Sequence, residues 1–137
     1  MIFRWCDCYA PLVGRFLLGG FFLWAGIAKL LDTAGTAGYI EAVGLPLPTA
    51  LAILALIFEI AVGGSLILGF LARYSALLLA VYTLFLNLVF HMNFADQIQL
   101  GFFLHNMTLI GGLLYVSTFG AGGYSIDSVR NTKQRRG

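Results

Sequence analysis

The stretch TALAILALIFEIAVGGSLILGFL, residues 49–71, decides the fold class of this chain. Its one ionisable side chain is Glu59, and nearly all the other residues are apolar. A helix needs about 20 apolar residues to cross the hydrocarbon core of a bilayer, and an open strand cannot satisfy its backbone there. The stretch therefore predicts a transmembrane helix.

Three further runs have the same character, at residues 10–31, 74–92 and 100–119. Of the 137 residues, 60% are hydrophobic and 10% are charged, whereas a typical soluble domain has about 25% charged residues. So few charges cannot keep the surface of a small soluble domain wet. We expect an all-α integral membrane protein, a four-helix bundle in a single domain (1–137) that ends in a polar basic tail (124–137).

The connection between the first two runs, residues 32–48, has a pattern of its own. Tyr39, Ile40 and Val43 have near-helical spacing, and the sequence GLPLP follows at 44–48. Glycine and proline end helices, and a short helix of this kind lies in the membrane interface. We therefore expect a short interfacial helix between the first and second transmembrane helices.

The charges outside the spans predict the orientation of the bundle. Basic residues lie at the N-terminus, between the second and third spans and in the C-terminal tail, while the other two connections are acidic. Loops rich in Lys and Arg stay in the cytoplasm. Both termini are therefore predicted to be cytoplasmic. The basic residues are Arg4, Arg73, Arg130, Lys133, Arg135 and Arg136, and the acidic ones are Asp32, Glu41 and Asp96.

Polar side chains from all four spans fall in the outer half of this predicted bundle. With a rise of about 1.5 Å per residue, Glu59 lies near the midplane and the others lie between it and the outer surface. Polar groups at such depths normally face the bundle interior or water, so a shared pocket is expected. The six residues are Lys29, Glu59, Asn87, His91, His105 and Asn106. Arg15 and Arg73 fall near the inner face and are interpreted as structural polar residues.

Glu59 allows two interpretations. An unpaired carboxylate at this depth would take up a proton, so Glu59 either pairs with Lys29 or a histidine, or titrates near neutrality. In the functional interpretation, Glu59 and His105 are catalytic residues that exchange protons with a bound ligand. In the structural interpretation, an ion pair and interhelical hydrogen bonds only hold the helices in register. The ligand-binding candidates are Lys29, Asn87, His91 and Asn106.

Two cysteines, Cys6 and Cys8, stand just before the first span. A spacing of two residues rarely suits a structural disulfide. Such a pair could bind Cu(I) or exchange thiols, but two free thiols in a reducing compartment are the simpler interpretation. His91 is a further candidate metal ligand, yet the predicted topology puts it on the opposite face from the thiols. We therefore assign no metal site.

Several short motifs follow one another in a characteristic order along the chain. They are Gly14-Arg15, Gly26-x-x-Lys29, Tyr39-x-x-x-x-Gly44-x-Pro46, Glu59-x-x-x-Gly63-Gly64, Gly69-x-x-x-Arg73, and Asn106 before Gly111-Gly112. Together they resemble the DoxX family over about residues 13–114. The resemblance implies a four-helix protein of the bacterial inner membrane. It also implies a loose association with redox work, since the family includes subunits of a thiosulfate:quinone oxidoreductase. Members often have Lys where this chain has His105, which weakens any carry-over of anion binding to this position.

Two classes of function remain open, and the sequence does not decide whether the chain is an enzyme. The first is a membrane subunit of a redox system that binds a quinone or another small ligand in the outer pocket. The chain has no haem, flavin or Fe–S motif, so electrons would come from a partner. The second is a non-enzymatic module that anchors a partner complex or assists metal handling or export. The expected partners are the lipid bilayer and either another protein or a second copy of the chain. A net charge of +2 gives no indication of nucleic acid.

Overall fold

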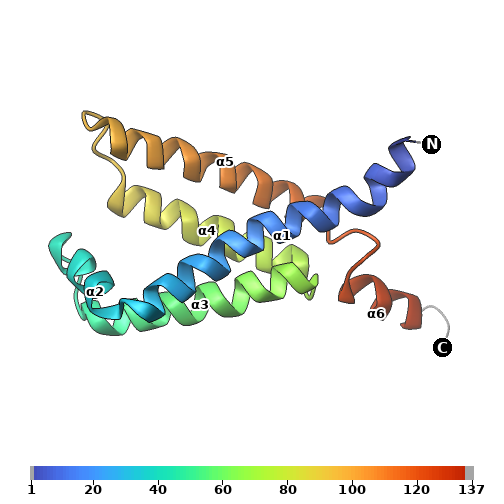
Figure 1. Cartoon of the computed structure of the whole chain (residues 1–137), viewed down its shortest axis with the longest axis horizontal. Coiled ribbons are helices and arrows are strands. Elements are labelled where there is room, and N and C mark those ends of the chain that lie inside the picture. Colours follow the sequence, from blue (N-terminus) through green and yellow to red (C-terminus); the bar gives the residue numbers. More distant parts are fainter. Residues whose placement is uncertain (1, 135–137) are drawn as a thin grey trace.

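The computed structural model describes the backbone of residues 2–134 and the side chains of residues 9–134, and throughout this part the regular structure is helical. Four helices, taken from Tyr9 in the first, are long and apolar enough to span a membrane, which confirms the predicted all-α fold. A shorter helix lies between the first two, as predicted. The helices are α1 (Ile2–Leu31), α2 (Thr33–Ala42), α3 (Pro48–Leu68), α4 (Ala72–Phe90), α5 (Gln97–Phe119) and α6 (Ile126–Gln134) (Figure 1).

The ends of the helices differ in detail from the ranges expected from hydropathy. Helix α1 begins well before the apolar run, at Ile2, and α3 ends at Leu68. The tail, expected as a polar segment, contains α6. Hydropathy detects only the part of a helix that meets lipid, so helical turns in the interface escape it. The N- and C-terminal ends of the chain lie at the same end of the bundle (Figure 1). Their predicted cytoplasmic location stays a prediction.

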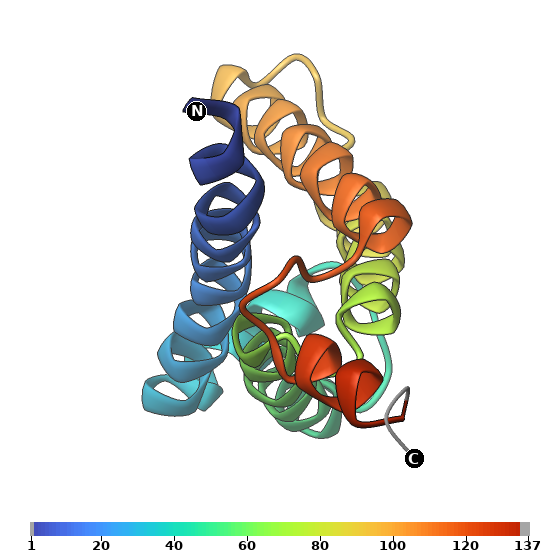
Figure 2. The ribbon, with the colours of Figure 1, turned by 90° about the vertical axis from the view of Figure 1, so that its right-hand side faces the viewer.

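The four long helices form two closely packed pairs. Helix α1 packs along α3, and α4 packs along α5, while α3 and α4 join the pairs. Helices α1 and α5 touch each other only sparsely, although they face each other across the bundle (Figure 2). The ring of helices is therefore closed least tightly between α1 and α5. This seam borders the outer cleft described below.

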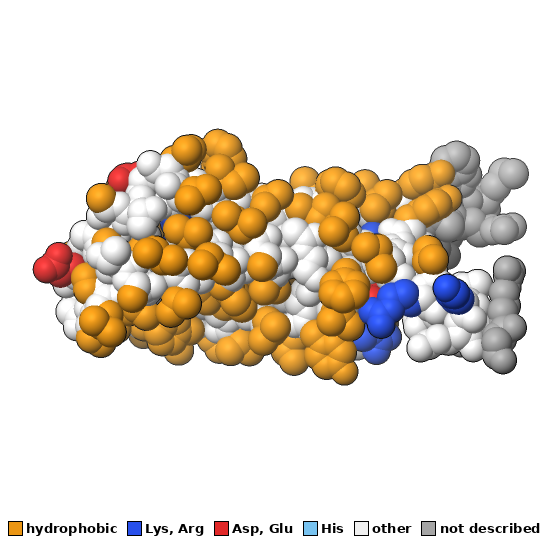
Figure 3. All heavy atoms as spheres, turned by 90° about the horizontal axis from the view of Figure 1, so that it is seen from below, with side chains coloured by type: hydrophobic (Ala, Val, Ile, Leu, Met, Phe, Trp, Pro, Cys, Tyr) orange, Lys and Arg blue, Asp and Glu red, His pale blue; other side chains and the backbone are white. Residues whose placement is uncertain are grey.

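The surface of the bundle is mostly apolar along its length (Figure 3). Helix α5 is the least buried of the spans, with 6% of its most apolar window inside the protein. Acidic side chains appear at the α2 end in this view, and Lys and Arg side chains appear near α6. Large apolar residues exposed on a membrane-spanning helix contact acyl chains, so this belt is the lipid-facing surface.

Close contact between α1 and α3 depends on glycine. A Cβ atom added at Gly19 would lie 2.7 Å from the carbonyl oxygen of Gly63 and 2.7 Å from Cγ1 of Ile67. A Cβ atom added at the neighbouring Gly20 would meet nothing within 4 Å. Small residues let membrane helices approach closely enough to pack by van der Waals contact. Gly19 therefore sets the distance between the two helices, and Gly20 does not.

We expect Gly19→Ala to destabilise the protein by about 1–3 kcal/mol, because the added methyl group must push α1 away from α3. The matched variant Gly20→Ala should change the stability by less than about 0.5 kcal/mol, since its methyl group enters open space. Reversible unfolding in mixed micelles measures both free energies. Equal stabilities of the two variants would contradict the close α1–α3 contact.

The turn between α3 and α4 is short and has an unusual backbone. Gly69 has a φ of 66° and Leu71 a φ of 48°, so both adopt the left-handed conformation. Glycine adopts it freely, whereas a leucine there costs conformational energy. Asp127, just inside α6, offsets part of this cost, because its two carboxylate oxygens accept hydrogen bonds from the backbone N–H groups of Leu71 (2.9 Å) and Ala72 (2.8 Å). The start of α4 is therefore capped by a residue from the C-terminal segment.

Candidate functional site

Glu59 is the centre of the polar residues in the outer half of the bundle. Its side chain is 2% exposed. Oε2 accepts a hydrogen bond of 2.8 Å from Nζ of Lys29, and Oε1 accepts one of 2.7 Å from the hydroxyl of Tyr82. The carboxylate thus has one partner on each oxygen, from α1 and from α4. The buried carboxylate therefore has both a close countercharge and a hydrogen-bond donor.

The sequence analysis did not select Tyr82. It stands in the middle of the third span, among apolar residues, and its ring lies 4.8 Å from that of Phe58. Tyrosines in membrane proteins are common at the interfaces, which is why a hydropathy argument passes over them. A phenol in the middle of a span, however, needs a hydrogen-bond acceptor. The position of Tyr82 in the middle of a span could therefore have indicated a buried acceptor such as Glu59.

Two asparagines form a second pair next to this network. Nδ2 of Asn106 donates to Oδ1 of Asn87 over 3.0 Å, and Nδ2 of Asn87 donates to the carbonyl oxygen of Phe103 over 3.2 Å. Asn87 is 0% exposed. These bonds tie α4 to α5, as interhelical amides do in other membrane proteins. Asn87 is consequently inaccessible to a ligand, while Asn106 borders the cleft described next.

A cleft of about 880 Å³ opens in the outer half of the bundle. Most of its lining residues come from α1 and α5, and Glu59 of α3 and Thr83 of α4 are also in the lining. The cleft brings together five of the six residues predicted for a shared pocket, and Asn87 is the sixth, one hydrogen bond away. The five are Lys29, Glu59, His91, His105 and Asn106.

The two histidines of the cleft differ in their surroundings. Nδ1 of His91 lies 2.7 Å from Oε1 of Gln99, so this ring is held to the start of α5. His105 is exposed to the cleft, and its ring lies 5.4 Å from that of Phe21 on α1. No described residue hydrogen-bonds the His105 imidazole. Of the two, His105 has ring nitrogens available for a ligand.

A second cleft, of about 620 Å³, lies between α2 and the outer ends of the spans. It shares Lys29, Tyr39 and His91 with the first cleft. Tyr39 of α2 stacks on Phe90 of α4, with ring centroids 5.2 Å apart. The side chain of Lys29 is 25% exposed although it pairs with the buried Glu59. The ammonium group can therefore be reached from the side of α2 as well as from the α1–α5 seam.

Arg15 and Arg73 lie at the other end of the bundle, away from these clefts. Arg15 is 1% exposed, and its guanidinium donates to backbone carbonyl oxygens of Leu66 (3.4 Å), Ile67 (3.0 Å) and Tyr124. It thereby joins α1 to the end of α3 and to the segment before α6. Arg73 is exposed and lines a separate pocket near α6.

The described side chains contain no group of three His, Cys, Asp or Glu residues that could hold a metal ion. Of the low-probability metal candidates, His91 is bound to Gln99 as above. Cys6 and Cys8 lie outside the residues whose side chains are described.

Four spanning helices around a partly polar cleft define a multi-pass membrane protein. The family model described as DoxX matches residues 10–92, so the chain belongs to the DoxX family. Among curated proteins it is similar to "Inner membrane protein YqjF" of Escherichia coli (strain K12), with 39% identity over 89% of this chain and 92% of the relative. It is also similar to "Inner membrane protein YphA" of the same strain, with 28% identity over 85% and 86% of the two chains. No solved structure matches significantly.

These comparisons place the chain in the inner membrane as a multi-pass protein. The match to the family model ends at residue 92, so it includes Lys29, Glu59 and Tyr82 but not His105 or Asn106. The part of the cleft formed by α5 therefore lies outside the match to the family model.

Proposed function

We propose that this protein binds the headgroup of a quinone in the outer cleft and serves as a membrane subunit of a redox system. The observation that carries the proposal is the convergence of an ammonium group, a carboxylate and an imidazole on one cleft of a bundle otherwise surrounded by lipid. Polar and ionisable groups are costly at such depths, and they commonly mark a site for a ligand.

Lys29 is suited to bind a carbonyl oxygen of the headgroup. An ammonium group has three N–H donors, and one of them is directed to Glu59. The remaining donors of a partly exposed Lys29 are available to a ligand in the cleft. Glu59 has both oxygens bound, so its role in the proposal is to hold Lys29 and Tyr82 in place and to balance the charge.

His105 is suited to exchange a proton with the ligand. Its imidazole lies in the cleft without a hydrogen bond to any described residue. A neutral imidazole has one ring nitrogen that donates and one that accepts a hydrogen bond, so it can pass a proton to a ligand or take one from it. Asn106, one residue further along α5, adds an amide to the same wall.

The apolar tail of a quinone also finds a route along the protein. A third cleft, of about 660 Å³ and mainly apolar, lies between α1 and α5 nearer the opposite end of the bundle. Gly14 and Leu18 of α1 and Gly112 and Val116 of α5 are among its lining residues. The outer cleft and this third cleft both follow the sparsely packed seam between α1 and α5. A ligand with a polar head and a long apolar tail therefore fits the seam better than a compact polar solute.

The proposal predicts that His105→Leu weakens the binding of a short-chain ubiquinone by about 3–10-fold, the effect of losing one hydrogen bond. The full-length protein in lipid nanodiscs is titrated with the quinone, and binding is followed by quenching of the intrinsic tryptophan fluorescence. Thr108→Val is the matched control. Thr108 is exposed on α5 outside the lining of the clefts, and its hydroxyl donates to the carbonyl oxygen of Leu104.

An unchanged affinity in His105→Leu, or the absence of quinone binding by the wild-type protein, would overturn this assignment. Copper or zinc bound in stoichiometric amounts by the purified protein would instead favour the alternative of a non-enzymatic module that assists metal handling. Stable co-purification of another protein without a bound quinone would favour a module that anchors a partner complex.

A further inference from the structure

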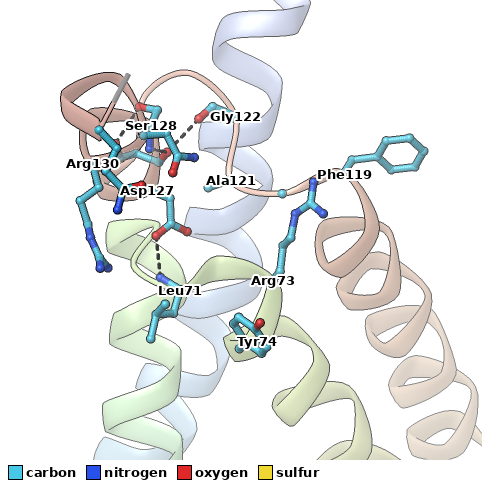
Figure 4. A pocket seen from close by; sticks show the side chains of 13 residues that line it. Leu71, Arg73, Tyr74, Phe119, Ala121, Gly122, Asp127, Ser128 and Arg130 are labelled. Atoms are coloured by element: carbon cyan, nitrogen blue, oxygen red, sulfur yellow. Dashed lines mark hydrogen bonds between the residues drawn. The ribbon is translucent and has the colours of Figure 1, made fainter. Parts of the chain in front are cut away.

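The opposite end of the bundle contains a pocket of about 390 Å³ between the start of α4, the end of α5 and α6 (Figure 4). We propose that this pocket binds the phosphate of an anionic phospholipid from the leaflet at that end. The proposal does not depend on the quinone headgroup site, because the outer cleft and this pocket share no lining residue and lie at opposite ends of the spans. The apolar cleft proposed for the quinone tail does adjoin this pocket, and both are lined by Phe119.

Two arginines supply the positive charge of the pocket. Arg73 is exposed, and its guanidinium has no hydrogen bond or ion pair with any described residue. The guanidinium carbon of Arg130 lies 5.5 Å from the ring centroid of Phe70, and Arg130 likewise makes no ion pair within the described chain. In Figure 4 the two arginines flank Asp127 from either side. Guanidinium groups bind phosphate oxygens through pairs of parallel hydrogen bonds.

Asp127 also lines the pocket, and its negative charge would oppose an anion if it were free. Both of its oxygens, however, accept hydrogen bonds from the N–H groups of Leu71 and Ala72 at the start of α4. A helix start carries a partial positive charge, which compensates this carboxylate. The charges of Arg73 and Arg130 are therefore left to an external anion. The side-chain amide of Asn131, also in the lining, adds a neutral donor.

The apolar part of the lining favours a lipid over free phosphate. Leu71, Tyr74 and Phe119 line the same pocket and are 44%, 69% and 66% exposed. They stand at or next to the ends of membrane-spanning helices, where acyl chains begin. A pocket that combines cations with exposed apolar side chains matches the boundary between headgroup and acyl chain. Basic pockets between transmembrane helices bind anionic lipid headgroups in this way.

The test counts phospholipids bound to the full-length protein by native mass spectrometry from detergent micelles. With phosphatidylglycerol as the probe, we expect binding about five-fold tighter than with zwitterionic phosphatidylcholine. Arg73→Gln should weaken phosphatidylglycerol binding about five-fold, and Arg73→Gln/Arg130→Gln about twenty-five-fold, because each basic residue near the surface contributes a similar factor. Since Arg73 is exposed and makes no described bond, its single substitution leaves the fold intact.

A control with the same loss of charge separates a pocket from a merely basic tail. Lys133→Gln removes one positive charge from α6, as Arg73→Gln removes one from the pocket, and Lys133 lies outside the pocket lining. We expect Lys133→Gln to lose less than about two-fold in affinity, since its exposed charge is screened by water and salt. Equal losses in Lys133→Gln and Arg73→Gln would overturn the proposal in favour of non-specific attraction by the tail.

Competition identifies the source of the phosphate. Inorganic phosphate at equal ionic strength should not displace phosphatidylglycerol, because it lacks the acyl chains that the apolar rim would contact. Displacement by millimolar inorganic phosphate would show a site for a free anion and overturn the lipid assignment. Equal binding of phosphatidylcholine and phosphatidylglycerol would overturn the role of the two arginines.

Discussion

Replacing Lys29 with methionine should destabilise the folded bundle by about 3–5 kcal/mol, because it leaves the charge of Glu59 buried without a countercharge. In this variant the hydrogen bond from the hydroxyl of Tyr82 would be the one remaining described contact that stabilises the carboxylate of Glu59. The free energy of unfolding in mixed micelles, measured at neutral pH, tests the expectation.

The double variant Lys29→Met/Glu59→Gln separates the cost of a lone charge from the worth of the pair. Removing both charges should restore most of the lost stability, since a buried ion pair often contributes little compared with neutral residues of similar size. Tyr82→Phe should cost only about 1 kcal/mol, the typical value of one hydrogen bond. A double variant as unstable as Lys29→Met alone would show that the Lys29–Glu59 contact does not account for the effect.

Arg15→Met should cost about 3 kcal/mol, since it removes charge-assisted hydrogen bonds to backbone carbonyls at the end of α3 and before α6. Its Nε has no partner, so the loss comes from the two terminal nitrogens. The effect should be local as well as global. Amide hydrogen exchange should accelerate in α6 and in the turn between α3 and α4, while the outer halves of the spans keep their protection.

Lys133→Met is the matched control for Arg15→Met. Lys133 is exposed on the last turn of α6 and makes no ion pair with a described residue, so its loss should leave both stability and exchange unchanged. Fast exchange confined to α6 in both variants would mean that α6 is loosely held even in the wild-type protein. That result would show that the hydrogen bonds of Arg15 do not hold α6 against the bundle.

The sequence predicted the architecture because apolar length and backbone hydrogen bonding leave a membrane span little choice. The short helix before residue 44 was predicted from the near-helical spacing of its apolar residues and from the glycine and prolines that follow it. The polar residues of the outer half could be brought together in advance because depth along a helix follows from residue number. The contact of Lys29 with Glu59 was one of the alternatives stated for that carboxylate, and the structure contains it.

Other features could not be read from hydropathy, since they depend on which side of a helix faces which neighbour. The hydrogen bond from Tyr82 to Glu59 and the contact of His91 with Gln99 both require the rotation of α4 and α5 about their axes. Helix α6 was missed because it is polar and short. Its position depends on contacts between residues far apart in the sequence, such as Asp127 with Leu71. The use of each pocket stays a prediction.

The bond between Arg15 and Tyr124 has a consequence for how the protein is made. The two residues are 109 positions apart, so the ribosome supplies the carbonyl of Tyr124 roughly 5–20 s after Arg15 at ordinary elongation rates. During that interval the guanidinium lacks one of its three backbone acceptors. A released chain that ends at residue 119 would hold all four spans yet lack this hydrogen bond, and protease added from the side of the termini should distinguish it from the full-length product.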